Sequence, residues 1–307
     1  MDERDKLATS QAALQWAASY LGEHGIRDAR MDAELLLAHC LVQPRLQFYL
    51  EPQRPLAADE RERFAELISR RGRREPLQYI TGRQEFMSLE FLVSPAVLIP
   101  RADTEMLVET ALSWARNQAR SLRILDLCTG SGAVAVSLAH YLEGSDIWAG
   151  DISAAAIEVA RANAERLGTH VCFAQGDLTG PFRGAVFDLI TANPPYIPRD
   201  DICGLEPEVG VAEPKLALDG GQDGLDFYRR LAVEATPLLG PGGKVMLEIG
   251  WDEGPQVQAI LTEAGFTTIK LIKDYAGRDR VVTASRPPTQ DRPPSDSKAS
   301  QPRTVPK

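Results

Sequence analysis

Apolar residues recur every three or four positions along the first 75 residues, which is the spacing of one face of a helix. This spacing predicts three helices, marked by Leu14, Ala17 and Leu21, by the run Met31–Leu41, and by Phe64, Leu67 and Ile68. No residue in this block points to catalysis. We therefore expect residues 1–75 to form a small helical domain that binds a partner or covers the next domain.

The pattern changes over residues 76–100. Short apolar segments, Leu77–Gly82 and Phe86–Pro95, favour strands with a glycine turn. We expect a hairpin linker between two domains in this stretch. A helix over about Asp103–Arg120 should follow it, with Asp103 or Thr104 as its N-cap.

Residues 101–284 contain apolar strand-like runs that alternate with helical segments. The predicted strands are Arg123–Leu127, Asp146–Asp151, Val171–Gln175, Phe187–Ala192, Lys244–Ile249, Thr268–Ile272 and Arg280–Thr283. The predicted helices are Ala133–Tyr141, Ser153–Leu167, Leu225–Leu239 and one more after residue 249, and a long loop covers Asn193–Gly224. This alternation predicts an α/β domain with a mostly parallel sheet and helices on both faces.

The last 23 residues, 285–307, contain Arg-Pro-Pro twice and almost no apolar side chains. Such a segment cannot bury enough surface to fold, so we interpret it as a disordered tail.

Charge and composition exclude several classes of protein. The 34 Lys and Arg against 43 Asp and Glu give a net charge of −9, which argues against a protein that coats nucleic acid. The longest apolar runs are shorter than the roughly 18 residues that span a bilayer. We expect no targeting signal, because Met1–Lys6 has neither a cationic start before an apolar stretch nor an Arg-rich amphipathic pattern. The four cysteines are too scattered to predict a metal site or a disulfide framework. We expect a cytoplasmic monomer with no metal and no direct contact with nucleic acid or membrane.

A glycine-rich turn follows the first predicted strand of the α/β domain. Gly130, Gly132 and Ala135 have the G-x-G-x-x-A spacing that lets a ligand approach a helix N-terminus. Asp151 follows 19 residues after Gly132, at the end of the next strand, where an acidic residue binds ribose hydroxyls. With Asp151 in this position, the spacing favours a cofactor site over a turn that only shapes the backbone, and it does not distinguish a dinucleotide from another adenosine cofactor.

Two further carboxylates would suit an adenosine cofactor that carries an amino-acid moiety. Asp126 lies beside the glycine turn and could contact the ammonium group of such a moiety. Asp177 follows the third strand and could accept from the adenine amino group, although a role in capping its own loop is an alternative.

The segment Asn193-Pro194-Pro195-Tyr196 follows the apolar strand Phe187–Ala192 at the same sheet edge. The two prolines lack N–H groups and keep the chain extended, so the segment presents rigid carbonyl acceptors. The Asn193 amide oxygen and the Pro194 carbonyl can accept from one NH₂ group, and Tyr196 can lie against its flat face. An amide or ring nitrogen is a poor nucleophile, so rigid orientation toward an electrophilic methyl is the available means of catalysis.

Together, Asp126–Gly132 and Asn193–Ile197 resemble the Rossmann-like S-adenosylmethionine-dependent amino-methyltransferases. The chain resembles more specifically the peptide chain release factor glutamine N5-methyltransferases. Further segments support this narrower resemblance, and they are Asp32–His39, Arg74–Gly82, Phe91–Pro95, Leu98–Glu105, Leu216–Gly221 and Asp274–Arg280.

The resemblance implies methyl transfer from S-adenosylmethionine to the glutamine amide in the Gly-Gly-Gln loop of a release factor. It implies a catalytic role for Asn193, Pro194 and Tyr196, which hold the amide together with Pro195. The predicted cofactor-binding residues are Asp126, Cys128, Thr129, Gly130, Ser131, Gly132, Asp151, Asp177, Leu178 and Asn193. The helical N-terminal domain would help dock the protein substrate.

Two other acceptors and one other class of protein remain as alternatives. The acceptor could be a glutamine of a ribosomal protein or an adenine of nucleic acid, although the net charge of −9 weighs against the latter. A non-catalytic cofactor-binding or partner-binding protein is the other class. Binding alone does not need an amide-orienting segment, so the presence of Asn193–Tyr196 disfavours a non-catalytic binding protein.

Three residues depart from the pattern of the resembled family. Cys128 stands where a glycine is usual, Leu178 where an aromatic residue often contacts adenine, and Ala102 where a proline is usual.

Two charged features have no assigned role. Arg70–Arg74 is predicted to be a solvated cluster that complements a helix C-terminus, with docking to an acidic surface of the partner as the alternative. Arg101 and Glu105 could form an ion pair, either beside the cofactor site or on the plain surface. No general base is assigned among the acidic residues Glu206, Glu208, Glu213 and Asp219.

Overall fold

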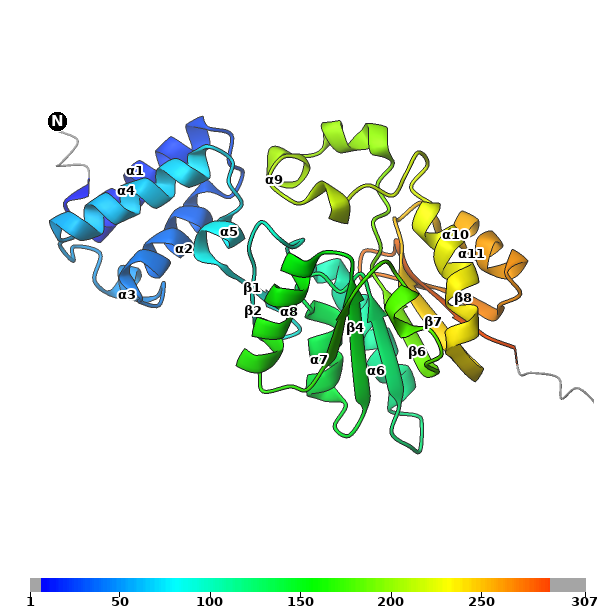
Figure 1. Cartoon of the computed structure of the whole chain (residues 1–307). Helices are drawn as coiled ribbons and strands as arrows, with labels where there is room; N and C mark the ends of the chain where they lie inside the picture. The colour runs from blue at the N-terminus through cyan, green and yellow to red at the C-terminus, as the bar shows by residue number, and fades with distance from the viewer. Residues whose placement is uncertain (1–6, 288–307) are drawn as a thin grey trace, which may run out of the picture.

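The computed structural model of the chain describes residues 7–287 (Figure 1). Most of the predicted tail, residues 288–307, lies outside this range. Within the described residues, no helix is long and apolar enough to cross a membrane.

Four helices form the N-terminal region: α1 (Ser10–Glu23), α2 (Ala29–Leu41), the short α3 (Gln47–Leu50) and α4 (Ala58–Gly72). The three long helices confirm the predicted ones. Leu14, Leu36 and Phe64 belong to one buried cluster, because the apolar face of each long helix points inward. The region therefore has a hydrophobic core of its own.

The linker prediction was wrong in part, because Leu77–Thr81 is a helix, α5, rather than a strand. Pro76 precedes the helix, and Gly82 ends it in the left-handed conformation with φ +73°. The predicted hairpin follows as β1 (Arg83–Phe86) and β2 (Leu89–Leu92). Its turn is formed by Met87 and Ser88, both at positive φ, and not by a glycine.

The C-terminal region contains a seven-stranded sheet in the order β5-β4-β3-β6-β7-β9-β8. The strands are β3 (Arg123–Leu127), β4 (Asp146–Asp151), β5 (Cys172–Gln175), β6 (Phe187–Ala192), β7 (Leu239–Glu248), β8 (Thr267–Lys273) and β9 (Asp279–Ser285). The five strands from β5 to β7 pair in parallel, and β9 is antiparallel to both of its neighbours. This arrangement confirms the predicted fold class.

Helices cover both faces of the sheet (Figure 1). They are α6 (Glu105–Ala115), α7 (Ala133–Tyr141), α8 (Ala154–Arg166), α10 (Asp226–Glu234) and α11 (Gly254–Glu263). Adjacent residues of β3 point to opposite faces: Ile124 lies in the cluster with α6 and α7, and Leu125 in the cluster with α10 and α11. Burial on both faces explains the continuous apolar runs of these strands.

Two helices differ in extent from their predicted bounds. The helix predicted over Asp103–Arg120 is α6, which ends at Ala115 and is preceded by a 3₁₀ turn, η2 (Ala102–Thr104). Neither predicted N-cap side chain caps it. The helix predicted over Leu225–Leu239 is divided at Pro237 into α10 and a 3₁₀ turn, η6 (Thr236–Leu238), after which β7 begins at once.

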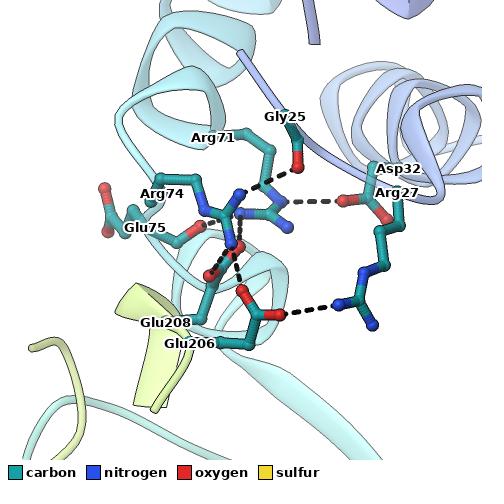
Figure 2. Close-up of polar contacts among 8 residues, drawn as sticks. All are labelled: Gly25, Arg27, Asp32, Arg71, Arg74, Glu75, Glu206 and Glu208. Atoms are coloured by element: carbon teal, nitrogen blue, oxygen red, sulfur yellow. Dashed lines mark hydrogen bonds and ion pairs between the residues drawn. The ribbon is translucent and has the colours of Figure 1, made fainter. Parts of the chain in front are cut away.

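The predicted loop Asn193–Gly224 contains three short helical turns: η4 (Arg199–Gly204), α9 (Pro207–Gly210) and η5 (Lys215–Ala217). Figure 1 shows this segment extending from the sheet toward the N-terminal helices. Arg71 and Arg74 of the N-terminal region form ion pairs with Glu208, and Arg74 also with Glu206 (Figure 2). The predicted solvated arginine cluster is thus wrong for Arg71 and Arg74, because carboxylates distant in sequence meet them in the fold.

Candidate active site

A cavity of about 260 Å³ lies at the carboxyl ends of the parallel strands. Ligands of open α/β sheets bind at this edge, where the loops after neighbouring strands come together. Most predicted site residues line the cavity, namely Asp126, Cys128, Thr129, Gly130, Ser131, Asp151, Asp177, Leu178, Asn193 and Pro195. Gly132, Pro194 and Tyr196 do not line it.

The turn after β3 has a left-handed backbone at Cys128 (φ +57°), Gly130 (φ +55°) and Gly132 (φ +80°). Open space lies where a Cβ atom of Gly130 would project, so the loop leaves room for a ligand there. Gly132 also has a packing role. A Cβ at Gly132 would lie 3.0 Å from Cβ of Ala160, so this glycine permits the close packing of α7 against α8.

Asp126 is almost fully buried, with 1% of its surface exposed. Its two carboxylate oxygens accept hydrogen bonds from the hydroxyls of Thr129 (2.7 Å) and Thr191 (2.8 Å). Burial raises the pKa of Asp126 to about 7, and the two hydroxyls act in the opposite direction. Within the described residues Asp126 forms no ion pair, so a ligand cation would stabilise its ionised form.

Asp151 is the last residue of β4 and connects two loops of the site. Its carboxylate accepts from the backbone N–H of Gly130 (2.9 Å) and of Ser153 (2.9 Å). These bonds hold the glycine turn against the N-terminus of α8, which begins with Ser153 as the predicted N-cap. A carboxylate has further lone pairs, so Asp151 can still accept from ligand hydroxyls. Burial raises its pKa above the ordinary value.

Leu178 and Asp177 form another wall of the cavity. Leu178 has a positive φ (+43°), and Asp177 forms an ion pair with Arg230 of α10 at 2.9 Å. Phe227, also on α10, is the cavity's one aromatic side chain in the described part of the chain. Its sequence neighbourhood, an ordinary amphipathic helix, gave no signal for this position.

Asn193 directly follows β6 and lines the cavity with its amide side chain. Its Nδ2 donates a hydrogen bond to Oγ1 of Thr104 at 3.2 Å, which leaves the carbonyl oxygen available as an acceptor. Tyr196 packs against the hydrophobic core beneath the loop, and burial raises its pKa well above the ordinary range. Its predicted contact with a substrate amide remains a prediction.

Known proteins resemble both regions of the chain. The model of the PrmC N-terminal domain matches residues 12–82, and that of a methyltransferase domain matches residues 124–205. A release factor glutamine methyltransferase of Moorella thermoacetica is 48% identical over 91% of this chain and 99% of its own length. The protein of the same name from Geobacter sulfurreducens is 43% identical over 92% of this chain and 98% of its own.

This chain belongs to the release factor glutamine methyltransferase family. A solved protein-(glutamine-N5) methyltransferase (release factor-specific) from Alicyclobacillus acidocaldarius is 33% identical, with a TM-score of 0.40. The match covers 64% of this chain and all of that one. The identity to the two relatives from Moorella and Geobacter confirms the resemblance inferred from the sequence motifs.

S-adenosylmethionine is the methyl donor that this family membership implies, and the side chains of the cavity fit it. Asp151 offers acceptors for ribose hydroxyls, and Asp126 offers a buried carboxylate for an ammonium group. Leu178 and Phe227 provide apolar surface suited to an adenine ring. The open space beside Gly130 admits a ligand close to the backbone.

The segment Leu98–Glu105, which supports the family resemblance, forms part of the cavity wall, although none of its residues was predicted as a site residue. Pro100, Arg101 and Thr104 line the cavity. The predicted ion pair between Arg101 and Glu105 is wrong. Arg101 donates to the buried carboxylate of Glu213 at 2.5 Å, and Glu105 accepts from the backbone N–H of Met87 at 2.7 Å. The Arg101–Glu213 pair connects this wall to the segment that follows Tyr196.

Proposed function

We propose that this chain transfers a methyl group from S-adenosylmethionine to the side-chain amide nitrogen of the glutamine in the Gly-Gly-Gln motif of peptide chain release factors. The observation that carries the proposal is the placement of the Asn193 amide. It lies in the wall of the cofactor cavity, with its Nδ2 bonded to Thr104 and its oxygen free to accept. The identity of this chain to relatives named as release factor glutamine methyltransferases supports the same substrate.

The cofactor would be held at the ends of four parallel strands, β3, β4, β5 and β6. Asp151 would accept from the ribose hydroxyls, and Asp126 would face the ammonium group. The remaining proposed contacts come from the glycine turn, the third loop and the start of the asparagine segment, namely Cys128, Thr129, Gly130, Ser131, Gly132, Asp177, Leu178 and Asn193. Bound S-adenosylmethionine supplies an electrophilic methyl group on a sulfonium.

The glutamine amide would be oriented by the segment that begins at Asn193. The Asn193 oxygen and the Pro194 carbonyl would accept from its NH₂ group, which turns the nitrogen lone pair toward the methyl group and withdraws it from the amide resonance. Pro195 keeps the segment rigid, and Tyr196 would complete the binding of the amide. The bond from nitrogen to methyl forms as the bond from sulfur breaks, and the nitrogen then releases its extra proton to water.

The N-terminal helices, residues 1–75, would dock the release factor, with residues 76–100 as the linker to the methyltransferase domain at 101–284. Support comes from the separate hydrophobic core of these helices and from the match of residues 12–82 to a family-specific domain. We propose that the enzyme acts as a cytoplasmic monomer on a protein substrate, without binding nucleic acid.

Transfer of radiolabelled methyl to a purified release factor tests this function. The controls are the Gly-Gly-Ala variant of the factor, a ribosomal protein fraction and duplex DNA. We expect label on the unmodified factor alone. Asn193→Ala should lower turnover by about 100-fold or more, as expected when a reacting group is misplaced, while cofactor binding measured by calorimetry is largely retained through the other contacts. Label on DNA or on another protein, with none on the factor, would contradict the proposed substrate.

A further inference from the structure

Thr104 is the last residue of η2 and sits directly before α6, where a threonine normally caps a helix. Its side chain makes no such cap. It is 96% buried, lines the cofactor cavity, and its Oγ1 accepts the hydrogen bond from Nδ2 of Asn193. The hydroxyl therefore serves the active site instead of the helix.

Glu248, the last residue of β7, lies behind Thr104 and is 1% exposed. Its Oε2 is buried and has no hydrogen-bond partner in the described structure. Burial raises the pKa of Glu248, whereas the neighbouring hydroxyls of Thr104 and Tyr196 and the charge of Arg280 favour its ionised form. A buried carboxylate needs donors, so it attracts the single hydroxyl proton of Thr104.

This arrangement determines what Thr104 can offer to Asn193. A threonine hydroxyl has one proton and two lone pairs. With the proton directed to Glu248, only acceptor positions remain, and these suit the NH₂ end of the Asn193 amide. Rotation of that amide by half a turn would place two acceptors, Oδ1 and Oγ1, against each other. It would also present an NH₂ group to the NH₂ group of the substrate.

Arg280 of β9 anchors the backbone on which Thr104 sits. Its guanidinium is largely buried, forms an ion pair with Asp103 at 3.0 Å and donates to the backbone carbonyl of Ile249 at 3.3 Å. Asp103 directly precedes Thr104, and Ile249 directly follows Glu248. The same side chain thus holds the two residues in register across β7, β9 and η2.

We propose that Thr104, backed by Glu248, is a positioning residue that fixes the Asn193 amide with its oxygen toward the substrate amide. This inference rests on the proposed role of Asn193 as the acceptor for the glutamine NH₂ group. Thr104 and Glu248 act through Asn193 and do not themselves touch the reacting atoms.

Thr104→Val tests the proposal, because valine keeps the shape of threonine but cannot accept a hydrogen bond. We expect kcat to fall by about tenfold, the equivalent of one hydrogen bond, with KM for the release factor and Kd for S-adenosylmethionine changed less than about threefold. Thr104→Ser retains the hydroxyl and should restore most of the rate. An unchanged kcat in Thr104→Val, or an equal loss in Thr104→Ser, would overturn the proposal.

Glu248→Gln provides a second, independent variant. A glutamine NH₂ group can donate to Oγ1 of Thr104 and compete with Asn193, so kcat should again fall while cofactor affinity holds. The double variant Thr104→Val, Glu248→Gln should lose little more than Thr104→Val alone, because both changes break one chain of contacts. Additive losses in the double variant would show that Glu248 acts by another route.

The NMR signal of the Asn193 side-chain NH₂ group separates this proposal from the proposed function. In the full chain with S-adenosylmethionine bound, the signal should be protected from exchange in the unmodified protein and in Thr104→Ser, and exposed in Thr104→Val. This readout needs no release factor. If methyl transfer to the factor fails but the protection pattern holds, the substrate assignment is wrong and the positioning by Thr104 stands. If the signal is equally exposed in all three proteins, the positioning is wrong.

Discussion

Three carboxyl groups in and behind the active site are buried enough that the pKa of each is raised to about 7: Asp126, Glu248 and Glu253. For Glu248, burial is the largest cause. The side chains of Thr104 and Tyr196 and the charge of Arg280 oppose it, and the nearby charge of Asp103 adds to the rise. An ionised Glu248 can only accept a hydrogen bond from the hydroxyl of Thr104, whereas the protonated acid can also donate one to it.

The charge of Glu248 should therefore appear in the pH dependence of catalysis. With S-adenosylmethionine and release factor saturating, we expect kcat to fall as the pH drops below about 7, because protonation of Glu248 releases the hydroxyl of Thr104. In Glu248→Gln, kcat should be lower at every pH, and the additional fall below pH 7 should be absent. The measurement is a pH profile of kcat for both proteins.

Asp126 titrates in the same range and is the necessary control for that profile. Its protonation should weaken the affinity for S-adenosylmethionine, because a neutral acid does not attract an ammonium group. Calorimetric Kd values at each pH separate this effect from the change in kcat. An acid limb of kcat that persists unchanged in Glu248→Gln at saturating cofactor would assign it to another group.

At the scale of the element, the conformation of Asn193–Tyr196 depends on a second segment, Leu216–Gly224. Backbone N–H of Ile197 donates to the Leu218 carbonyl at 3.0 Å, and that of Gly220 donates to the Ile197 carbonyl at 2.9 Å. A Cβ atom at Gly220 would lie 2.7 Å from Cα of Tyr196. This glycine therefore permits a backbone contact that sets the position of the proposed amide-binding residues.

Gly220→Ala should displace the segment that carries Asn193 and Tyr196. We expect kcat to fall by about 100-fold, the usual effect of a displacement of about 1 Å at a reacting centre, with affinity for S-adenosylmethionine changed far less. Steady-state kinetics and calorimetry measure the two effects. Gly204→Ala is the matched control, since Gly204 lies in the same loop (Asn193–Gly224), also lacks a positive φ and has open space around the added atom. Equal losses in both variants would contradict the explanation.

The sheet could be predicted from the sequence because its strands are buried on both faces. The bounds of Arg123–Leu127, Asp146–Asp151 and Phe187–Ala192 agree with the structure, since apolar runs between turn residues define them. The strand prediction for Leu77–Thr81 was wrong because a run of five residues that mixes apolar and polar side chains fits a strand or a helix equally well. Its outcome was decided by Pro76 and by the left-handed Gly82 at its two ends.

The cofactor loops of the site were predictable for a related reason, because glycine spacing and the place of Asp151 are local signals. The interaction partners of the site residues could not be predicted from the sequence. Thr104 meets Asn193 across 89 positions, and Arg101 meets Glu213 across 112. Such contacts leave no periodic trace in the sequence, so only the fold reveals them.

At the scale of the whole molecule, ion pairs join the N-terminal helices to the segment that follows Tyr196 (Figure 2). Arg71 is 8% exposed and donates to Asp32 at 2.7 Å and to Glu208 at 2.9 Å. Arg74 donates to Glu208 at 2.7 Å and to Glu206 at 2.9 Å. The proposed docking region is thereby connected to the loop that carries the proposed amide-binding residues.

Glu208→Gln should weaken this connection. Burial alone would raise the pKa of Glu208, but hydrogen bonds from Arg74 and Arg71 outweigh it and lower the pKa. A lowered folded-state pKa means that the ion pairs stabilise the protein above the ordinary glutamate range and lose this effect as the pH falls through the folded-state value. We expect the variant to lose about 1–3 kcal/mol of stability at pH 7, measured by chemical denaturation, and to approach the unmodified protein at acid pH.

The same variant tests whether the connection serves substrate docking. Because fewer ion pairs would hold α9 against the helices, we expect KM for the release factor to rise severalfold while Kd for S-adenosylmethionine stays constant. Asp59→Asn is the matched control: it removes one carboxylate charge from α4, but its partner Arg63 lies on the same exposed helix face. If Glu208→Gln loses stability but KM does not change, these ion pairs stabilise the fold and do not contribute to substrate docking. A raised KM in both variants would indicate a general effect of charge on the encounter with the release factor.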